Sequence, residues 1–235
     1  ALIEGQLLLD LGADTYLHNL YGKLDLRQVR ACLITHVHSD HLYAEELDNR
    51  RPDFAHMEEE FPLTVYGSAE AIEQVQERIK GPALDSGRVR LETVEPFVPF
   101  TAAGYTVTAL PAQHGTRQPL VYIIQKDGKA LLYAHDTSSF DEETWNWLEN
   151  SGLHLDLVSM DCTAGIVPIN YRGHMNFERD VAFAERLRQA GVIDDRTRLI
   201  ANHFSHNGHI NYDAAQEPTV NCGFEISYDG MTVEF

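Results

Sequence analysis

The sequence predicts a layered α/β domain in which β-strands alternate with α-helices. Short apolar runs bounded by turn residues recur along the chain, and segments of helical period lie between several of them. Two apolar runs flank Asp127-Gly128, which is a strong hairpin signal. Apolar residues make up 43% of the 235 residues and no linker or low-complexity segment interrupts them, so we expect one domain over residues 1–235.

Strands are expected where apolar runs end at Gly, Pro, Asn or Asp. Gly5 provides the turn of an opening hairpin, and the last twelve or so residues are expected to close on a second hairpin. In chain order, the predicted strands are residues 2–3, 7–10, 31–35, 63–67, 88–94, 97–100, 105–110, 120–126, 130–135, 155–160, 199–202, 224–228 and 231–235.

Helices are expected where apolar residues recur every three or four positions. Ser68 is an N-cap residue, and Gly81-Pro82 is expected to end the helix that Ser68 begins. Residues 48–62 are polar and broken by prolines, so they are expected to form a loop or an interrupted helix. In chain order, the predicted helices are residues 42–50, 69–80, 142–150 and 177–190, with a helical turn at 213–216.

The charge balance disfavours nucleic acid as a partner. Eighteen basic and thirty-six acidic residues give a net charge of −18, and no cluster of Lys and Arg is present to neutralise phosphates. A small-molecule substrate fits this balance better than a polynucleotide.

Other bulk features bear on the compartment. No apolar run approaches the roughly 20 residues that span a bilayer. The three cysteines include no CxxC pair, which indicates a reducing cytoplasm. The chain opens with Ala1 inside an expected strand, which leaves open that N-terminal strands are missing, and the sequence also leaves a homodimer open.

The densest chemical signal is "LITHVHSDHL", from Leu33 to Leu42. Alternate residues of a strand point the same way, so His36 and His38 can share one side of the strand exit. The following turn brings Asp40 and His41 round toward the same pocket. A catalytic zinc ion usually takes three protein ligands, so these four residues indicate two metal ions.

"THVHSDH" resembles the signature of the metallo-β-lactamase superfamily, whose fold is an αββα sandwich of two mixed β-sheets flanked by helices. Three further motifs follow in the family's order over nearly the whole chain: "ALPAQHG" with His114, "LLYAHDTSS" with Asp136 and "NHFSHNGH" with His203. The resemblance implies one metal ion on His36, His38 and His114, a second on Asp40, His41 and His203, and Asp136 shared between them.

Two divalent ions can hold a hydroxide between them, because the pKa of bound water falls from 15.7 to about 7. The resemblance implies that Asp40 both binds metal and orients this nucleophile. The ligand set favours zinc, with manganese or iron as alternatives.

A further histidine, His174 in "YRGHMNFERD", precedes a predicted helix. In the phosphodiesterase branch of the superfamily, a histidine on the corresponding loop lies beside the scissile phosphate. The resemblance therefore implies that His174 is a general acid or a phosphate stabiliser. The alternative is a helix-entry histidine that binds only backbone groups.

Several neighbouring residues leave two interpretations open. Asp10 either supports a ligand histidine or forms a turn, and Asp161 either orients a ligand or lies outside the site. Cys162 is expected to be a small buried residue, since no base pairs with it. His135 is expected to be structural or to support a ligand. His206 and His209 are expected at the rim of the site and His56 in solvent, with contact to substrate as the alternative.

The branch of the superfamily follows from the bridging aspartate. Asp136 argues against β-lactam hydrolysis, because the β-lactamases proper lack it, whereas lactone and thioester hydrolases keep it. The combination of His174 and "NHFS" is similar to the tRNA 3′-processing endonucleases (tRNase Z) and to the cyclic phosphodiesterase of phosphonate breakdown. We expect a phosphodiesterase acting on a small cyclic or diester phosphate, with a lactone, thioester or ester hydrolase as the alternative. A tRNase Z-like nuclease fits less well because of the net charge.

Overall fold

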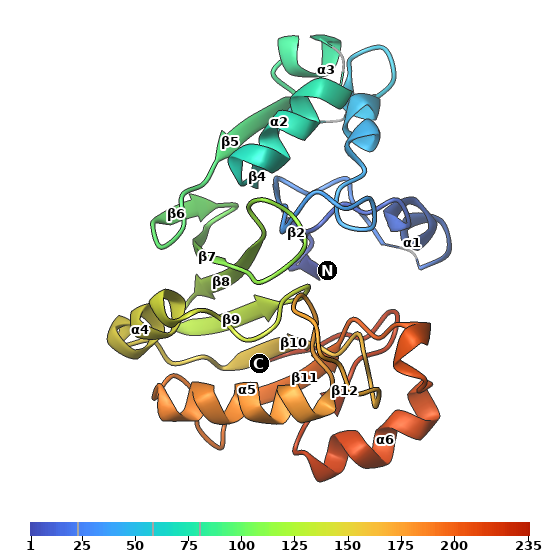
Figure 1. Ribbon diagram of the computed structural model, residues 1–235. Helices are drawn as coiled ribbons and strands as arrows, with labels where there is room; N and C mark the ends of the chain where they lie inside the picture. Colours follow the sequence, from blue (N-terminus) through green and yellow to red (C-terminus); the bar gives the residue numbers. More distant parts are fainter. Residues whose placement is uncertain (23, 58, 80) are drawn as a thin grey trace. The chain divides into compact units, whose positions relative to one another are not determined.

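The computed structural model describes residues 1–22, 24–57, 59–79 and 81–235 (Figure 1). The chain divides into two compact units. The first unit comprises Ala1–Tyr105 and Thr116–Leu120, and the second comprises Thr106–Gly115 and Val121–Phe235. Two predictions touch residues outside the description: the end of a helix at Lys80, and the part of the predicted 48–62 loop that contains Glu58.

The first unit is built on a mixed sheet with the strand order β1-β2-β3-β4-β5. The predicted opening hairpin is confirmed, because β1 (Leu2–Ile3) runs antiparallel to β2 (Leu7–Leu9). From β2 onward the strands are parallel: β3 (Ala31–Leu33), β4 (Leu63–Gly67) and β5 (Val89–Thr93). Because the carboxyl ends of β2 and β3 meet at the same edge of the sheet, Asp10 lies beside the loop that carries the clustered histidines.

Helices of the first unit pack on this sheet. Ser68 caps α2 (Ala69–Arg78) by accepting a hydrogen bond from the amide of Ala71, as predicted. Ala71 and Val75 of α2 pack with Val65 of β4 in the unit's hydrophobic core. The other helical elements are α1 (Thr15–Tyr21), the 3₁₀ segment η1 (Ala44–Arg50) and α3 (Gly81–Asp85).

The helix that Ser68 begins ends before Gly81-Pro82, as predicted. α2 stops at Arg78, and Gly81-Pro82 opens the separate helix α3, because proline is tolerated in the first turn of a helix. One prediction for this unit is wrong. Residues 42–50 form a 3₁₀ segment from Ala44, not an α-helix. The strand β6 (Pro99–Ala102) also belongs to this unit.

The second unit contains a mixed sheet in which β12, β11, β10, β9, β8 and β7 are neighbours in that order. The predicted hairpin is confirmed: β8 (Leu120–Lys126) is antiparallel to β9 (Lys129–Ala134) across Asp127-Gly128, both of which have positive φ. β9, β10 (Leu157–Asp161), β11 (Arg198–Asn202) and β12 (Glu225–Ile226) run parallel, and β7 spans Tyr105–Pro111. Asp136, Asp161 and His203 therefore emerge at one edge of this sheet.

Helices accompany this sheet as well. α4 (Glu142–Ser151) and α5 (Phe177–Gln189) begin at the caps Asp141 and Asn176, and their aromatic residues Trp145 and Phe183 pack against each other. Figure 1 shows α5 running along the strands β10 and β11. α6 (Tyr212–Asn221) is longer than the predicted turn, and the 3₁₀ turn η2 covers His206–Gly208.

The predicted C-terminal hairpin is wrong. β12 is only two residues long and pairs in parallel with β11, and residues 231–235 form no strand. The fold class is confirmed, since both sheets are mixed and flanked by helices. Among the described residues, no helix is long and apolar enough to cross a membrane.

Asp180 is a buried carboxyl group in the first turns of α5, where its side chain lies beside the Cys162 thiol. Burial raises the pKa of Asp180 well above its ordinary value, although the hydrogen bond from Cys162 opposes this shift and the charge of Asp161 adds to it. Burial likewise raises the pKa of Cys162, so this thiol stays protonated and is no nucleophile.

The shift at Asp180 makes stability depend on pH. A carboxyl group whose pKa is raised by folding contributes stability that is complete below its unfolded pKa and is lost as pH rises toward the folded pKa. We expect Asp180→Asn to gain stability over the parent protein by about 1 kcal/mol per pH unit above roughly pH 4. Urea unfolding of both proteins between pH 5 and pH 8 measures this difference, and a difference that stays constant with pH would contradict the assignment.

Candidate metal centre

Three predicted site residues stand at strand ends in a left-handed backbone conformation. Asp10, Asp136 and His203 have φ values of 61°, 50° and 62°. This region is uncommon for residues other than glycine, and such strain concentrates at functional sites. The sharp turn at each position redirects the chain as it leaves the sheet.

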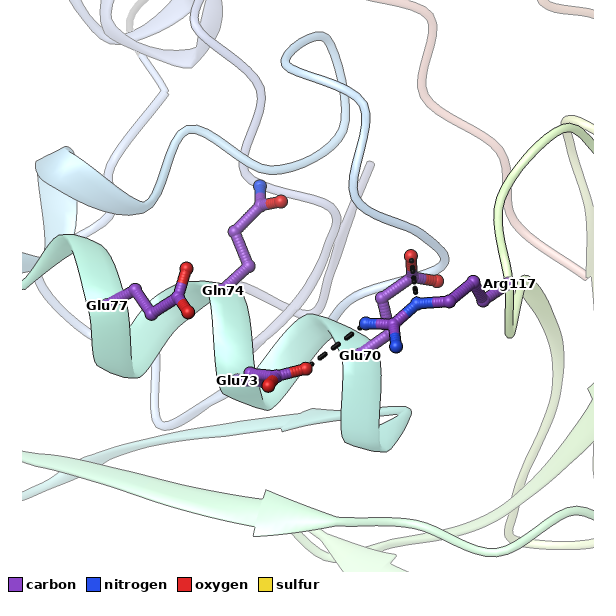
Figure 2. Close-up of a pocket in the computed structure, with 5 residues that line it drawn as sticks. All are labelled: Glu70, Glu73, Gln74, Glu77 and Arg117. Atoms are coloured by element: carbon purple, nitrogen blue, oxygen red, sulfur yellow. Dashed lines mark hydrogen bonds and ion pairs between the residues drawn. The ribbon is translucent and has the colours of Figure 1, made fainter.

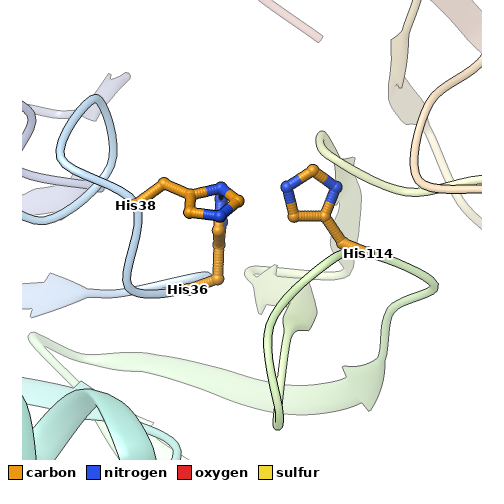
Figure 3. Close-up of side chains that lie close together, drawn as sticks. All are labelled: His36, His38 and His114. Carbon is orange, nitrogen blue, oxygen red and sulfur yellow. Dashed lines mark hydrogen bonds between the residues drawn. The ribbon is translucent and has the colours of Figure 1, made fainter.

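The first unit brings His36, His38, Asp40 and His41 together on the loop after β3. Nε2 of His36 lies 2.9 Å from Nδ1 of His38, and the imidazole rings of His36 and His41 lie 4.3 Å apart. Nε2 of His41 lies 3.5 Å from a carboxylate oxygen of Asp40, whose side chain is 68% exposed. Figure 3 shows His36 and His38 with their rings beside each other.

Asp10 holds this cluster from the end of β2. Its carboxylate accepts hydrogen bonds from the amide and the hydroxyl of Thr35 at 2.8 and 2.9 Å. Nδ1 of His41 donates to the other oxygen at 2.8 Å. The sequence left two interpretations of Asp10 open, and these contacts favour the one in which Asp10 supports a ligand histidine.

Gly12 allows the segment after β2 to pass close to the histidine loop. A Cβ atom at Gly12 would lie 2.0 Å from the carbonyl oxygen of Asp40, and the amide of Leu11 donates to the carbonyl of His41. The clashing atom belongs to the backbone, so no side chain can swing away to make room.

We therefore expect Gly12→Ala to lower the free energy of unfolding by about 1–3 kcal/mol, because the backbone must move to admit the methyl group. Gly115→Ala is the matched control, since a Cβ there meets nothing within 4 Å. Urea unfolding compares the two variants, and equal stability would show that the close approach has no energetic consequence.

The second unit gathers the remaining predicted residues around Asp136, which is 3% exposed. One carboxylate oxygen lies 3.0 Å from Nε2 of His203, and the other lies 3.6 Å from Nε2 of His114 and 3.7 Å from Nδ1 of His174. Figure 3 includes His114, on the loop that follows β7. Asp136, Asp161, His174 and His203 each offer an atom within 4.8 Å of those of the others, as a metal site requires.

Asp161, at the carboxyl end of β10, fixes His174 in place. One of its oxygens accepts from Nδ1 of His174 at 2.9 Å, and the other accepts from the amides of Thr163 and Met175 at 2.9 and 3.1 Å. The sequence suggested that Asp161 could orient a ligand, but its partner is His174. The ring of His174 is thus held through Nδ1.

Four of the five predicted ligand histidines share one arrangement. In each, Nδ1 is paired with a nearby group of the same unit. His36 pairs with the Thr35 hydroxyl and His41 with the Asp10 carboxylate. His114 pairs with the Gly173 carbonyl and His203 with the Thr163 hydroxyl. In each, Nε2 faces another predicted ligand. Metal-binding histidines are oriented in this way by a partner on the second nitrogen. The donor set therefore fits divalent metal ions.

The other histidines differ. His135 is buried and bonds to the Ser159 hydroxyl at 2.7 Å. His206, His209 and His56 are exposed.

A pocket on the first unit has a different character. Figure 2 shows Arg117 bound to Glu70 and Glu73 of α2, with Gln74 and Glu77 completing the lining. Among the five described residues that line this pocket, the cationic one, Arg117, is already paired with two carboxylates, so the pocket is poorly suited to an anionic substrate.

Comparison with known proteins identifies the class. The model of a family described as the beta-lactamase superfamily domain matches residues 7–204. The chain belongs to the metallo-β-lactamase superfamily.

A ribonuclease Z of Listeria innocua is 30% identical over 129 residues, which are 54% of this chain and 41% of that protein. The chain thus matches less than half the length of this curated relative. Among solved structures, a diphosphatase from the PhnP family superposes with a TM-score of 0.74 at 20% identity, covering 100% of this chain and 82% of that one. The metallo-β-lactamase fold protein YhfI from Bacillus subtilis has a TM-score of 0.70 at 21% identity, covering 94% and 82%. These likenesses confirm the predicted fold.

Proposed function

We propose that the chain is a dinuclear metal-dependent phosphodiesterase that acts on a small cyclic or diester phosphate. His36, His38 and His114 would hold one divalent ion, and Asp40, His41 and His203 would hold the other. Asp136 would serve both. Zinc suits this set best, and manganese or iron are the alternatives.

The observation that carries the proposal is the pair of His174 and Asp161 next to Asp136. Asp161 holds Nδ1 of His174 at 2.9 Å, and the side chain of His174 is 21% exposed. A histidine that is held by a carboxylate and partly exposed is suited either to protonate a leaving oxygen or to stabilise a phosphate. A phosphodiester releases a poorly stabilised alkoxide, which makes such an acid useful.

Bound metal ions would polarise the phosphate and lower the pKa of water. The chain's own groups prepare this chemistry in advance. Asp10 contacts Nδ1 of His41 and Thr163 contacts Nδ1 of His203, so that Nε2 of each ring would be the metal-binding nitrogen. The exposed carboxylate of Asp40 would orient a nucleophile. The cysteines are free, and Cys32 and Cys162 are buried, which fits a reducing compartment such as the cytoplasm.

Two other activities are outcomes that the test must separate. The same ligands could serve a lactone, thioester or ester hydrolase. The relatives named ribonuclease Z favour a nuclease, but the net charge of −18 opposes binding to a polyanion.

The deciding experiment compares turnover of bis(p-nitrophenyl) phosphate, a panel of lactones and thioesters, and a structured RNA by the zinc- and manganese-loaded protein. The proposal predicts that phosphodiester turnover exceeds the others and disappears with a chelator. Preferential turnover of lactones or thioesters would overturn it in favour of carbonyl chemistry, and preferential cleavage of RNA would establish a nuclease.

A further inference from the structure

The segment that carries His174 is long and irregular. Residues 162–176 form no helix or strand between β10 and α5. Such long loops are uncommon unless they have a function, and their backbone carbonyl groups need hydrogen-bond donors. How the middle of this loop is held determines how firmly His174 is placed.

One side chain donates to three of the carbonyl groups in the middle of the loop. Nη1 of Arg179, on α5, donates to the carbonyls of Tyr171 at 2.7 Å and of His174 at 3.2 Å. Nη2 donates to the carbonyl of Ile169 at 2.7 Å. A guanidinium group has a rigid, planar set of donors, so three contacts from one group fix the loop against the helix.

Other side chains also contact the loop. The side-chain amide of Asn176 donates to the carbonyl of Val167 at 3.0 Å, and Nδ1 of His114 donates to the carbonyl of Gly173 at 2.9 Å. Asp161 holds the His174 ring. Arg179 thus adds a contact to the carbonyl of His174, while Asp161 contacts the ring of His174 and the amide of Met175.

We infer that Arg179 is a positioning residue for His174. This inference rests on the proposed function, in which Arg179 orients the His174 ring toward the leaving group. Without the guanidinium, three carbonyls lose their donor and the loop, whose Tyr171 and Arg172 are exposed, relaxes toward water. A displacement of about 1 Å in a catalytic group can cost roughly 100-fold in rate.

The first test needs no activity. Hydrogen exchange of peptides covering residues 166–175 is compared among the parent protein, Arg179→Met and Arg188→Met. Arg188 lies on the same helix and pairs only weakly, at 3.9 Å, with Glu185. Faster exchange in Arg179→Met alone is expected, and unchanged exchange would overturn the inference. If Arg179→Met does not fold, Arg179→Lys is used instead. It keeps the charge and the aliphatic chain but lacks the planar guanidinium donors, and its exchange is expected to change in the same direction.

The second test is kinetic. Arg179→Met should lower kcat for a phosphodiester about 10- to 100-fold with little change in KM or metal content. The double variant Arg179→Met/His174→Ala should be no slower than His174→Ala, because both changes remove the same function. Multiplying losses would overturn the positioning role. If the parent protein showed no phosphodiester turnover, the proposed function would be wrong. The exchange experiment would still decide whether Arg179 holds the loop.

Discussion

Replacing Asp136 with asparagine is expected to remove most bound metal and to lower hydrolysis by more than about 100-fold. Asp136 is buried, and its two oxygens lie 3.0 Å from Nε2 of His203 and 3.6 Å from Nε2 of His114. Loss of a residue that only orients a metal ligand costs about 10- to 100-fold in metal affinity or activity, so loss of the proposed shared ligand should cost more. Elemental analysis and turnover measure the two effects.

Asp127→Asn provides the matched control for this substitution. Asp127 also has positive φ, at 50°, but it is exposed in the turn between β8 and β9. It should keep the metal content and activity of the parent protein. If Asp136→Asn also kept both, Asp136 would not be a metal ligand.

His174→Ala is expected to lower kcat for phosphodiesters by about 10²- to 10⁴-fold, the usual contribution of a general acid. The loss should be larger for poor leaving groups than for p-nitrophenolate, which departs without a proton. Metal content should not change, because His174 is not among the proposed metal ligands and its Nδ1 contacts Asp161. Steady-state kinetics with esters of graded leaving groups is the measurement.

His154→Ala is the control for this variant, because His154 is exposed and lies 3.9 Å from Asp194 on the surface. An equal loss with every leaving group would show that His174 stabilises the phosphate and does not donate a proton. An unchanged rate would remove His174 from the mechanism altogether.

Much of the fold was predictable because its signals are local. The strand at 63–67 and the Asp127-Gly128 hairpin agree with the structure, since alternation and turn chemistry act over a few residues. α1 could not be predicted in this way, because Tyr16, Leu17, Leu20 and Tyr21 are exposed and show no buried face. The last five residues look like a strand but find no partner strand.

The site, like the fold, has features that local sequence signals predict and features that depend on distant segments. The candidate ligands could be named because they stand directly after strands or within one short motif. The groups that orient them could not, because their roles depend on distances between remote segments. The pairing of Asp161 with His174, the contact of Gly12 with the Asp40 carbonyl and the three carbonyls held by Arg179 are examples.

The most direct test of the proposed dinuclear centre is native mass spectrometry of metal-free protein titrated with zinc, with phosphodiesterase activity followed in parallel. We expect two ions per chain, activity that appears as the sites fill, and fewer bound ions in both His38→Ala and His203→Ala, which change one residue in each unit. A protein that binds no zinc, or that binds two ions regardless of either substitution, would contradict the account.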